Sequence, residues 1–385
     1  MKLFHLADLH IGKKVNGYSM IDDQRFVLDQ VIARIRAERP DALILAGDIY
    51  DRRNPPVEAV ALFDAFVSQV VLELDVPVLA IGGNHDGGER LGFANAIQAK
   101  AGLHLAGAFS WPLPKVRLTD ADGPVDVYLM AYADLAVLHQ LVPETEGMDY
   151  AQAMDHVLSQ TPLDPAARNV LVAHGVVTGD EALATCDSER TLSIGGTEFW
   201  QSASLVAFDY VALGHLHQAQ RAGSDRIRYA GSLLQYSFSE ENQQKVMLSV
   251  QLSADGALQI ETLPLNPLRR LVTVRGMLEN LLTVPPELSA HRDDYLRVVL
   301  EDAGSLLEPM QRLKSCYPHI MLLERASELS TLTDQALPQA QQIGKKRTPL
   351  EMFTAFYEQV TDAPADDELC ALMQEIFEEV QKETL

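Results

Sequence analysis

The chain has 385 residues, more than one hydrophobic core usually serves, so two or three domains are expected. Its 54 Asp and Glu outnumber its 31 Lys and Arg, and on bulk charge alone a formal charge of −23 argues against a nucleic-acid partner, because such binding usually rests on a basic surface. Its cysteines form no CxxC pair, which argues against a disulfide scaffold or a thiolate zinc site and favours a reducing compartment: Cys186, Cys316 and Cys370.

Short apolar runs alternate with helical patterns in the first hundred residues. Three runs predict strands buried on both faces: residues 3–8, 42–48 and 76–86. Between the first two, Ser19 and Asp22 predict a capping box, and Pro40 closes a helix with one apolar face: Val27, Leu28, Val31, Ile32 and Ile35. The same spacing predicts a second helix from Val60, Phe63, Val67, Val70, Val71 and Leu74. This alternation predicts right-handed crossovers and an at least partly parallel sheet.

Further strands are predicted downstream, where helical patterns become rarer: 125–132, 169–175, 210–217 and 227–235. Residues 246–252 and 258–265 predict a hairpin that turns at Asp255-Gly256. A second sheet stacked on the first is therefore expected, which gives an α/β sandwich with helices outside. The N-terminal apolar run is too short for a signal peptide, and no stretch reaches the length of a membrane span, so a cytoplasmic protein without a membrane partner is expected.

The pattern changes near Pro267, so residues 1–266 are expected to form one domain. Residues 267–329 predict a small α/β domain with three strands separated by two helical segments. The Gln-rich residues 330–348 predict a linker. Residues 349–385 predict two helices, each with one apolar stripe that needs a partner surface: Leu350, Phe353, Tyr357 and Val360, then Leu369, Met373, Ile376 and Val380.

Most of the predicted strands end in polar residues. They form five short motifs in chain order: Asp8-Leu9-His10, Gly47-Asp48 with Asp51, Asn84-His85-Asp86, His174-Gly175, and His215-Leu216-His217. Five of the 11 histidines thus lie at strand ends, where open α/β sheets place their ligand sites. Each motif alone has an ordinary explanation as a turn or a chance match. All five together, each after an apolar strand, predict a metal site.

The residue types indicate which metals would bind. Carboxylates, one amide oxygen and imidazoles, without a thiolate, suit Mn²⁺, Fe²⁺ or Zn²⁺ more than copper. One carboxylate can bridge two cations about 3.5–4 Å apart, the separation used in two-metal phosphoester chemistry. Asp8 and His10 lie two residues apart and so face the same side of an extended segment, as do His215 and His217.

The set resembles the calcineurin-like metallophosphoesterase superfamily, whose pattern is D-x-H, G-D-x-x-D, G-N-H-D/E, a single His, then G-H-x-H. The stretches DLHIGK, GDIYDRRNPP, SERTLSIGGTEFW and YVALGHLHQAQ, with RYAGSLLQYSFSEE, are further similar to the SbcD family, the nuclease subunits of bacterial SbcCD complexes. This resemblance covers most of the chain. SbcD-type proteins usually carry Trp where this chain has Leu9, a position that is not a ligand.

The resemblance implies an α/β fold with a metallophosphoesterase β-sandwich, a small α/β capping domain and a C-terminal helical segment. It implies two divalent metals, Mn²⁺ foremost, the first held by Asp8, His10, Asp48 and His217. The second would be held by Asp48, Asn84, His174 and His215. His85 would face the scissile phosphate and act in catalysis, and Asp51 would orient a ligand or the substrate.

The implied activity is 3′→5′ exonuclease action on duplex DNA and endonuclease action at hairpins or blocked ends, in DNA repair, recombination and replication. Lys13, Lys14, Arg52 and Arg53 flank the first two motifs and could contact phosphates, although solvated loop charge explains them equally well. Arg269, Arg270 and Arg275 could contact DNA from the capping domain.

The implied partners are the ATPase SbcC and a second copy of the nuclease subunit. Residues 350–385 hold ten acidic residues against one basic residue, Lys382, so this tail should bind protein rather than DNA. ATP would be handled by SbcC, because the chain has no G-x-x-x-x-G-K-[ST] loop.

Two other functions stay open at this stage. A cyclic-nucleotide phosphodiesterase or a protein phosphatase of the same superfamily would share every metal ligand, but it would not need the residues after Pro267. A metal-free scaffold would normally have lost ligands, and here none is missing.

Overall fold

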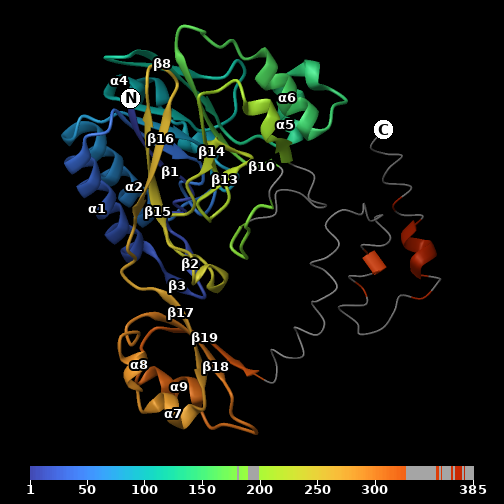
Figure 1. The fold of residues 1–385 in the computed structure, drawn as a ribbon. Helices are drawn as coiled ribbons and strands as arrows, with labels where there is room; N and C mark the ends of the chain where they lie inside the picture. The colour runs from blue at the N-terminus through green and yellow to red at the C-terminus, as the bar shows by residue number, and fades with distance from the viewer. Residues whose placement is uncertain are drawn as a thin grey trace. The chain divides into compact units, whose positions relative to one another are not determined.

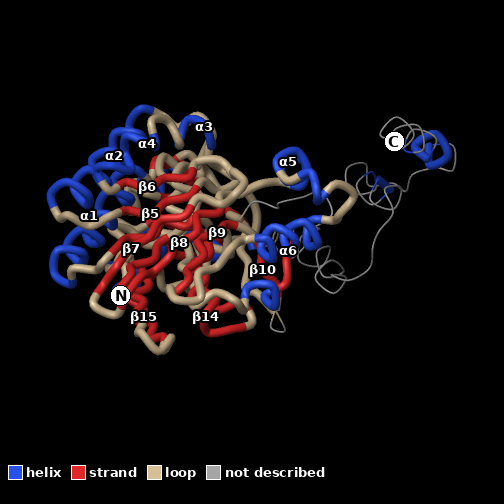
Figure 2. The backbone as a smooth tube through the Cα atoms, turned by 90° about the horizontal axis from the view of Figure 1, so that it is seen from above, coloured by secondary structure: helices blue, strands red, loops and turns tan. Residues whose placement is uncertain are grey.

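The first sheet follows the predicted alternation of strands and helices. Strands β1 (Lys2–Leu6), β4 (Ala42–Ala46), β5 (Val78–Ile81) and β6 (Leu103–Ala106) lie side by side and parallel. Helices α1 (Ile21–Glu38) and α2 (Val57–Ser68) pack on its outer face, where their apolar residues share a core with the strands (Figure 2). A π-helical turn, Gln69–Glu73, continues α2, and the short helices α3 (Gly88–Leu91) and α4 (Asn95–Ala101) precede β6.

In this computed structural model, the described residues are 1–179, 182–189, 199–326 and, nearer the C-terminus, 353–354, 357, 366, 369–374 and 377. The chain divides into two units, Met1–Glu324 and Arg325–Leu385. The first unit contains two six-stranded sheets and one three-stranded sheet (Figure 1). Among the described residues, no helix is long and apolar enough to cross a membrane.

Two details of the predicted helices are wrong. Ser19 and Asp22 form no capping box, because Ser19 belongs to β3 (Tyr18–Ser19), which pairs with β2 (Lys14–Val15). This small hairpin sets the start of α1, where Met20 is the N-cap without a side-chain cap bond. Val60, predicted on the apolar face of α2, is 44% exposed, whereas the other predicted apolar positions of both helices are buried.

The second sheet has the order β13-β14-β12-β9-β8-β7. Its strands are β7 (Lys115–Asp120), β8 (Gly123–Met130), β9 (Arg168–His174), β12 (Tyr210–Gly214), β13 (Gln220–Ala222) and β14 (Ser224–Tyr229). Helices α5 (Leu135–Leu141) and α6 (Tyr150–Gln160) pack on it, and Asp149 begins α6 with a capping box. A buried layer that includes Ile44, Leu79, Val127 and Val170 joins the two sheets, which confirms the predicted sandwich.

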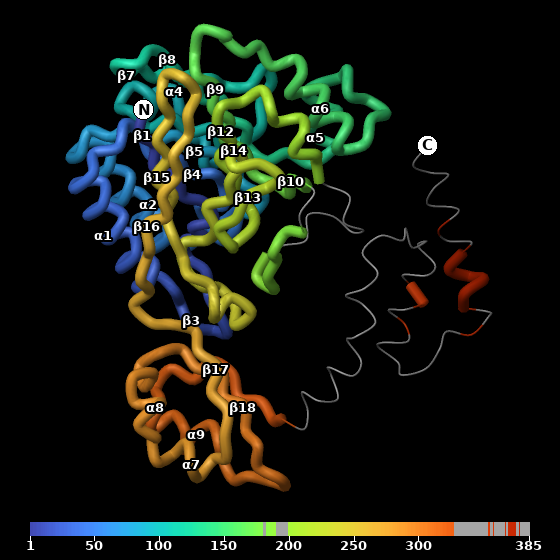
Figure 3. Tube along the Cα trace, in the orientation of Figure 1, coloured from blue at the N-terminus to red at the C-terminus, as the bar shows by residue number. Residues whose placement is uncertain are grey.

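The predicted hairpin is confirmed and extends the first sheet. Strand β15 (Val246–Leu252) pairs antiparallel with β16 (Leu258–Pro264) on one side and with β1 on the other. Figure 3 shows this late hairpin running beside the N-terminal strand. The short parallel strands β10 (Val176–Thr178) and β11 (Phe199–Gln201) pair with each other outside both large sheets.

A small domain, residues 271–325, has its own apolar core. Strands β17 (Leu271–Gly276), β18 (Tyr295–Leu300) and β19 (Ile320–Arg325) form its sheet in that order. Between them lie α7 (Leu278–Leu282), α8 (Pro286–Ser289) and α9 (Pro309–Lys314), so there are three helical segments where two were predicted.

The predicted linker 330–348 lies outside the described residues, as do Leu350, Val360, Ile376 and Val380 of the predicted stripes. Phe353, Tyr357, Leu369 and Met373 are helical, as predicted for this segment. The boundaries of the four predicted parts of the chain remain predictions.

Candidate metal centre

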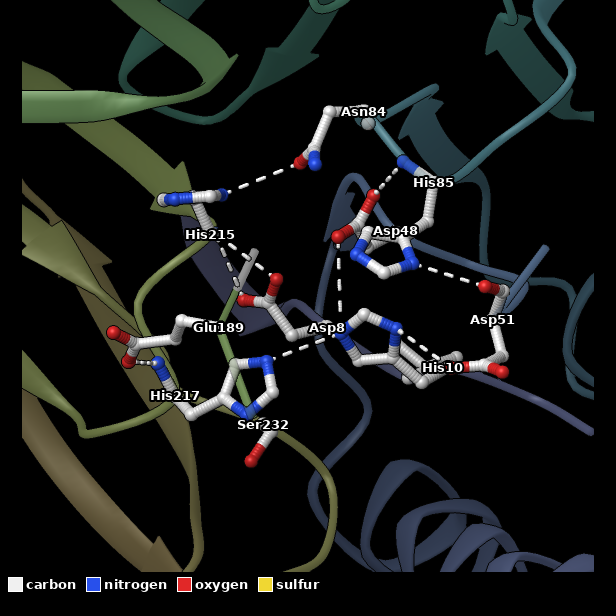
Figure 4. A network of polar contacts seen from close by, with 12 residues as sticks. Asp8, His10, Asp48, Asp51, Asn84, His85, Glu189, His215, His217 and Ser232 are labelled. Carbon is white, nitrogen blue, oxygen red and sulfur yellow. Dashed lines mark hydrogen bonds and ion pairs between the residues drawn. The ribbon is translucent and has the colours of Figure 1, made fainter. Parts of the chain in front are cut away.

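The predicted ligands come together where the strands of the two large sheets end. Asp8 and His10 follow β1, Asp48 follows β4, Asn84 follows β5, His174 ends β9, and His215 and His217 follow β12. Figure 4 shows these side chains, His174 excepted, pointing toward one another: Asp8, His10, Asp48, Asn84, His215 and His217. All seven residues are buried, with Asn84 the most exposed at 6%.

The seven side chains form two adjoining groups. In the first, ligand atoms of Asp8, His10 and His217 lie within 4.8 Å of one another, and Nε2 of His10 is 3.1 Å from Nε2 of His217. In the second, Asp8, Asp48 and His174 meet the same limit. Oδ1 of Asn84 lies 3.0 Å from Nε2 of His174 and 3.3 Å from Nδ1 of His215.

Asp48 lies between the two groups. Its Oδ2 is 3.7 Å from Nε2 of His10 and 3.5 Å from Nε2 of His174. Its Oδ1 accepts a hydrogen bond of 2.9 Å from the backbone N–H of His85. One carboxylate therefore faces both sets of imidazoles, which is the arrangement a bridging ligand requires.

The backbone of the centre is strained. Four of these residues have positive φ angles: Asp8 at 51°, His10 at 45°, Asp48 at 50° and His215 at 107°. Outside glycine such conformations cost of the order of 1–3 kcal/mol each and cluster at functional sites. Backbone bonds link the two loops, since Asp8 N–H donates to Gly47 O at 3.1 Å and His10 N–H donates to Asp48 O at 2.9 Å.

Glycines before the ligands are required because other groups approach them closely, as Gly83 and Gly47 show. A Cβ atom at Gly83 would lie 2.2 Å from Oδ1 of Asp48, and one at Gly47 would lie 2.3 Å from Nδ1 of His174. Gly47 also has a φ of +87°. Any other residue would push a ligand side chain out of place, so the glycines in the G-D and G-N-H-D motifs serve the geometry of the centre.

The buried ionisable groups of the centre shift one another's pKa values. Burial raises the pKa of Asp8 well above its usual range, although His174 opposes this. Burial also opposes ionisation of Asp48, but the neighbouring imidazoles of His174 and His10 hold its pKa well below the usual value. Burial lowers the pKa of His174, but Asp48 and Asp8 outweigh it and raise that pKa to about 9. The pair Asp48 and His174 thus behaves as a buried ion pair.

The donor set fits divalent cations. Burial lowers the pKa of His10 well below its usual value and that of His215 to about 3, so both rings are neutral near pH 7. A neutral imidazole carries one ring N–H, and neutral imidazole nitrogens together with carboxylate and amide oxygens are ligands for Mn²⁺, Fe²⁺ or Zn²⁺. Within the described part of the chain, Nδ1 of His10 and Nδ2 of Asn84 are buried without a hydrogen-bond partner, so these two nitrogens are not satisfied there.

A further set of buried groups orients His217, and sequence reasoning missed it. Nδ1 of His217 lies 2.8 Å from Ser188 Oγ and 3.5 Å from Glu240 Oε1. Glu240, in the 3₁₀ turn Phe238–Glu240, is fully buried and pairs with Lys245 at 2.5 Å. Held at Nδ1, His217 presents Nε2 to the centre. The only sequence signal was the acidic pair Glu240-Glu241 near the end of SLLQYSFSEE.

Asp86, the last residue of G-N-H-D, connects two loops of the centre through hydrogen bonds. Its carboxylate accepts hydrogen bonds of 3.0, 2.9 and 2.9 Å from the backbone N–H groups of Ile49, Tyr50 and Gly83. Burial, followed by the charge of Asp48, raises its pKa to about 7 despite these three donors. It thereby ties the loop after β4 to the loop after β5.

His85 and Asp51 lie beside the two groups. Nδ1 of the half-buried His85 is 2.9 Å from the backbone oxygen of Asp51, and its ring centroid is 4.8 Å from that of His10. The carboxylate of Asp51 pairs with Lys13 at 2.7 Å and lies 3.9 Å from Nδ1 of His10. Figure 4 shows His85 between Asp48 and Asp51.

The basic residues predicted to contact DNA differ in exposure and in whether an acidic side chain pairs with them. Lys13 is held by Asp51 and lies over the ring of Tyr236, with Nζ 5.5 Å from the ring centroid. Lys14 is exposed, and Arg52 is 68% exposed, with Nε 3.5 Å from Asp51. Arg53 is exposed and, together with Asn84, lines a cleft of about 450 Å³. Just before the small domain, Arg269 pairs with Asp23 and Arg270 is exposed, and within the domain Arg275 is exposed.

Comparisons with known proteins agree on the family. Residues 1–219 match the family model described as calcineurin-like phosphoesterase, and residues 267–361 match the one described as type 5 capsule protein repressor C-terminal domain. The D subunit of the nuclease SbcCD of Staphylococcus epidermidis is 32% identical over 330 residues, which are 84% of this chain and 85% of that protein.

Two solved structures are distantly similar. A dimetal phosphatase from Danio rerio matches 68% of this chain and 95% of its own, and the protein TT1561 of Thermus thermophilus matches 68% and 98%. Both are 12% identical with a TM-score of 0.38, a value too low to add to the assignment. From the family model over more than half of the chain and from the staphylococcal relative, it follows that the chain belongs to the calcineurin-like phosphoesterases, in the family of SbcD nuclease subunits.

Proposed function

We propose that this chain is a metal-dependent DNA nuclease that hydrolyses phosphodiester bonds as the SbcD component of an SbcCD-type complex. The observation that carries the proposal is the position of Asp48, whose Oδ2 faces His10 on one side and His174 on the other. The match to the staphylococcal nuclease subunit, over 84% of this chain, supports the substrate class.

Two divalent metals, Mn²⁺ in this proposal, would share Asp48. Asp8, His10 and His217 would complete the first set of ligands, and Asn84, His174 and His215 the second. When bound, such metals supply a hydroxide nucleophile at neutral pH and offset the negative charge of the phosphoryl oxygens. Asp8 and Asp48 have positive φ angles, and Gly83 leaves room for the Asp48 side chain, so both carboxylates would be in position before the substrate binds.

His85 is proposed as the catalytic residue. With Nδ1–H donated to the backbone oxygen of Asp51, its Nε2 is the nitrogen left to contact the substrate. When the ring is protonated, Nε2–H can donate a hydrogen bond to the phosphate or pass its proton to the leaving sugar oxygen. Asp51 would then act in positioning, through its backbone oxygen on His85 and its carboxylate on Lys13.

The finer activities and the partners are also part of the proposal. The chain would degrade duplex DNA from 3′ ends and cut hairpins or blocked ends, in repair, recombination and replication in the cytoplasm. Arg53 and Lys14 are the better candidates for phosphate contacts, because Lys13 already pairs with Asp51.

The domains and partners belong to the same proposal. Residues 1–266 would form the nuclease domain and 267–329 the capping domain. The segment 349–385 would bind the ATPase SbcC through a linker at 330–348, and two copies would form a dimer.

The test follows cleavage of a 3′-labelled DNA duplex with Mn²⁺ by the wild type and by His85→Ala. We expect labelled mononucleotide from the wild type alone, while both proteins retain the same metal content. Loss of metal in His85→Ala would move His85 into the ligand set. His139→Ala is a matched control, because that ring contacts the backbone of Met148 in the other half of the sandwich.

If the wild type does not cleave DNA, either the activity needs SbcC or the substrate is a small phosphodiester, and two further assays distinguish these explanations. If the wild type cleaves a small phosphodiester with Mn²⁺ but not DNA, adding SbcC decides between them. DNA cleavage restored by SbcC would support the proposal, whereas continued inactivity would favour a phosphodiesterase of small substrates. A wild type that retains little manganese or iron after purification would instead favour a scaffold.

A further inference from the structure

Gln24, in the first turn of α1, holds the loop that carries His10. Its side chain is fully buried, and Nε2 donates to the backbone oxygens of His10 at 2.7 Å and Leu9 at 3.3 Å. Its Oε1 accepts from the backbone N–H of Gly12 at 3.0 Å. One glutamine therefore bonds to the loop on both sides of His10.

The hydrogen bonds of Gln24 lie where the backbone is strained. His10 has a φ of 45°, and a left-handed residue other than glycine persists only when its surroundings impose the conformation. Tyr236 supports the same loop, since its hydroxyl donates to Leu9 O and accepts from Gln24 Nε2 at 3.0 Å. The Tyr236 ring packs edge-on against His10, with centroids 5.5 Å apart.

The preceding residue, Asp23, contacts the small domain instead. Its buried carboxylate accepts a hydrogen bond of 2.8 Å from the hydroxyl of Tyr295, the first residue of β18. It also pairs with Arg269 at 3.3 Å, and the Arg269 guanidinium lies 5.6 Å from the centroid of the Tyr295 ring. Nearby, the hydroxyl of Tyr18 donates to Ile320 O at 3.1 Å.

We propose that Gln24 is a positioning residue for His10 and that Asp23 links this position to the small domain. Adjacent residues on one helical turn thus contact the metal-binding loop on one side and β18 on the other. A change in how the small domain sits against Asp23 would reach His10 through that single turn. The inference rests on the proposed function, because it concerns the same metal centre.

The first experiment measures Mn²⁺ affinity of the full-length, metal-stripped chain by calorimetric titration. Gln24→Met keeps the length of the side chain and removes every bond to the loop, so affinity should fall about 10- to 100-fold. The matched control is Gln30→Met on the same helix. The Gln30 side chain also donates to a backbone oxygen and accepts from a backbone N–H, both of Asn266, at 2.7 and 3.1 Å. Removing these two bonds should leave the Mn²⁺ affinity unchanged.

The second experiment tests the link to the small domain. Tyr295→Phe removes only the hydroxyl that bonds to Asp23 and should weaken Mn²⁺ binding roughly fivefold, the worth of one ordinary hydrogen bond. Tyr317→Phe is its control, because that hydroxyl bonds to Leu281 O at 2.9 Å within the small domain. Both variants should melt at similar temperatures in chelator, and only Tyr295→Phe should lose affinity for the metal.

The outcomes separate this inference from the proposed function. A wild type that binds no Mn²⁺ would overturn the proposed function. A wild type that binds, with Gln24→Met binding equally well, would overturn the positioning role even if the variant melts earlier. If Gln24→Met weakens binding but Tyr295→Phe does not, the link through Asp23 is wrong. Should Gln24→Met not fold, Gln24→Glu keeps the acceptor for Gly12 and lacks both donors, so the same loss is expected.

Discussion

Around the candidate metal centre the buried side chains are carboxylates, imidazoles and an amide, whereas the small domain buries leucines, valines and an isoleucine. The centre holds four non-glycine residues in left-handed conformations and keeps two carboxylates out of water. The small domain follows ordinary packing of three strands against short helices. The small domain also has two residues at positive φ, Val284 and Glu308, so the difference lies chiefly in the buried polar groups. Burying ligands that must converge costs stability, and the apolar regions around the centre offset that cost.

The largest effect should come from Asp48→Asn. The change keeps the volume but removes the charge that faces both His10 and His174, so both metals should bind poorly. We expect nuclease turnover to fall about 10³-fold or more, since metal charge stabilises the transition state by several kcal/mol. Metal content after dialysis and single-turnover cleavage are the measurements. The matched control is Asp126→Asn, whose buried carboxylate pairs with Arg117 and Lys115 in the second sheet and should cost stability without loss of metal.

Gly83→Ala should come next. The added methyl group would lie 2.2 Å from Oδ1 of Asp48, so the carboxylate must move away from the metals. We expect Mn²⁺ affinity to fall about 10- to 100-fold, measured by titration. Gly256→Ala in the β15–β16 turn is the control, where the nearest atom is 3.7 Å away and only backbone strain is added. Equal affinity in both variants would show that the centre tolerates a shift of Asp48.

A smaller effect is expected from pH. The pKa of His174 is raised from 6.5 to about 9 in the folded, metal-free chain, so its charged form stabilises the fold below pH 6.5. That contribution should be lost as pH rises from 6.5 through 9, and Mn²⁺ should bind more tightly over the same interval because it displaces the proton. Melting in chelator and titrations between pH 6.5 and 9 measure the two trends. A metal-free melting temperature that rises over this interval would contradict the assignment.

The smallest effect on the centre is expected from Leu313→Ala. Leu313 is fully buried in the core of the small domain, so the change should destabilise that domain by about 2–5 kcal/mol. Under conditions where the domain stays folded, Mn²⁺ affinity should not change. A proportional loss of metal affinity would mean that the core of the small domain, and not only the contact between Tyr295 and Asp23, affects the metal centre.

The sequence motifs predicted the candidate metal ligands, but they did not predict the residues that hold those ligands in position. Strand periodicity placed Asp8, Asp48 and Asn84 after buried strands, and parallel strands bring such ends to one edge. No motif marked Gln24, and only the acidic pair Glu240-Glu241 marked Glu240, because each acts through a contact with a loop that lies outside its own element, 14 and 23 residues earlier in the chain. The capping box at Ser19 was wrong for a related reason: a hairpin, not the helix, determines how that serine bonds.

By itself, the sequence determined the alternation of strands and helices, the late hairpin and the order of the polar motifs, since these depend on local periodicity and turn residues. Only the tertiary structure decided that the hairpin joins β1, that Asp48 lies between two groups of histidines, and that Asp23 and Gln24 contact different regions. The physical reason is that strand pairing across hundreds of residues and the meeting of two sheets arise from burial of apolar surface over the whole chain, which short motifs do not encode.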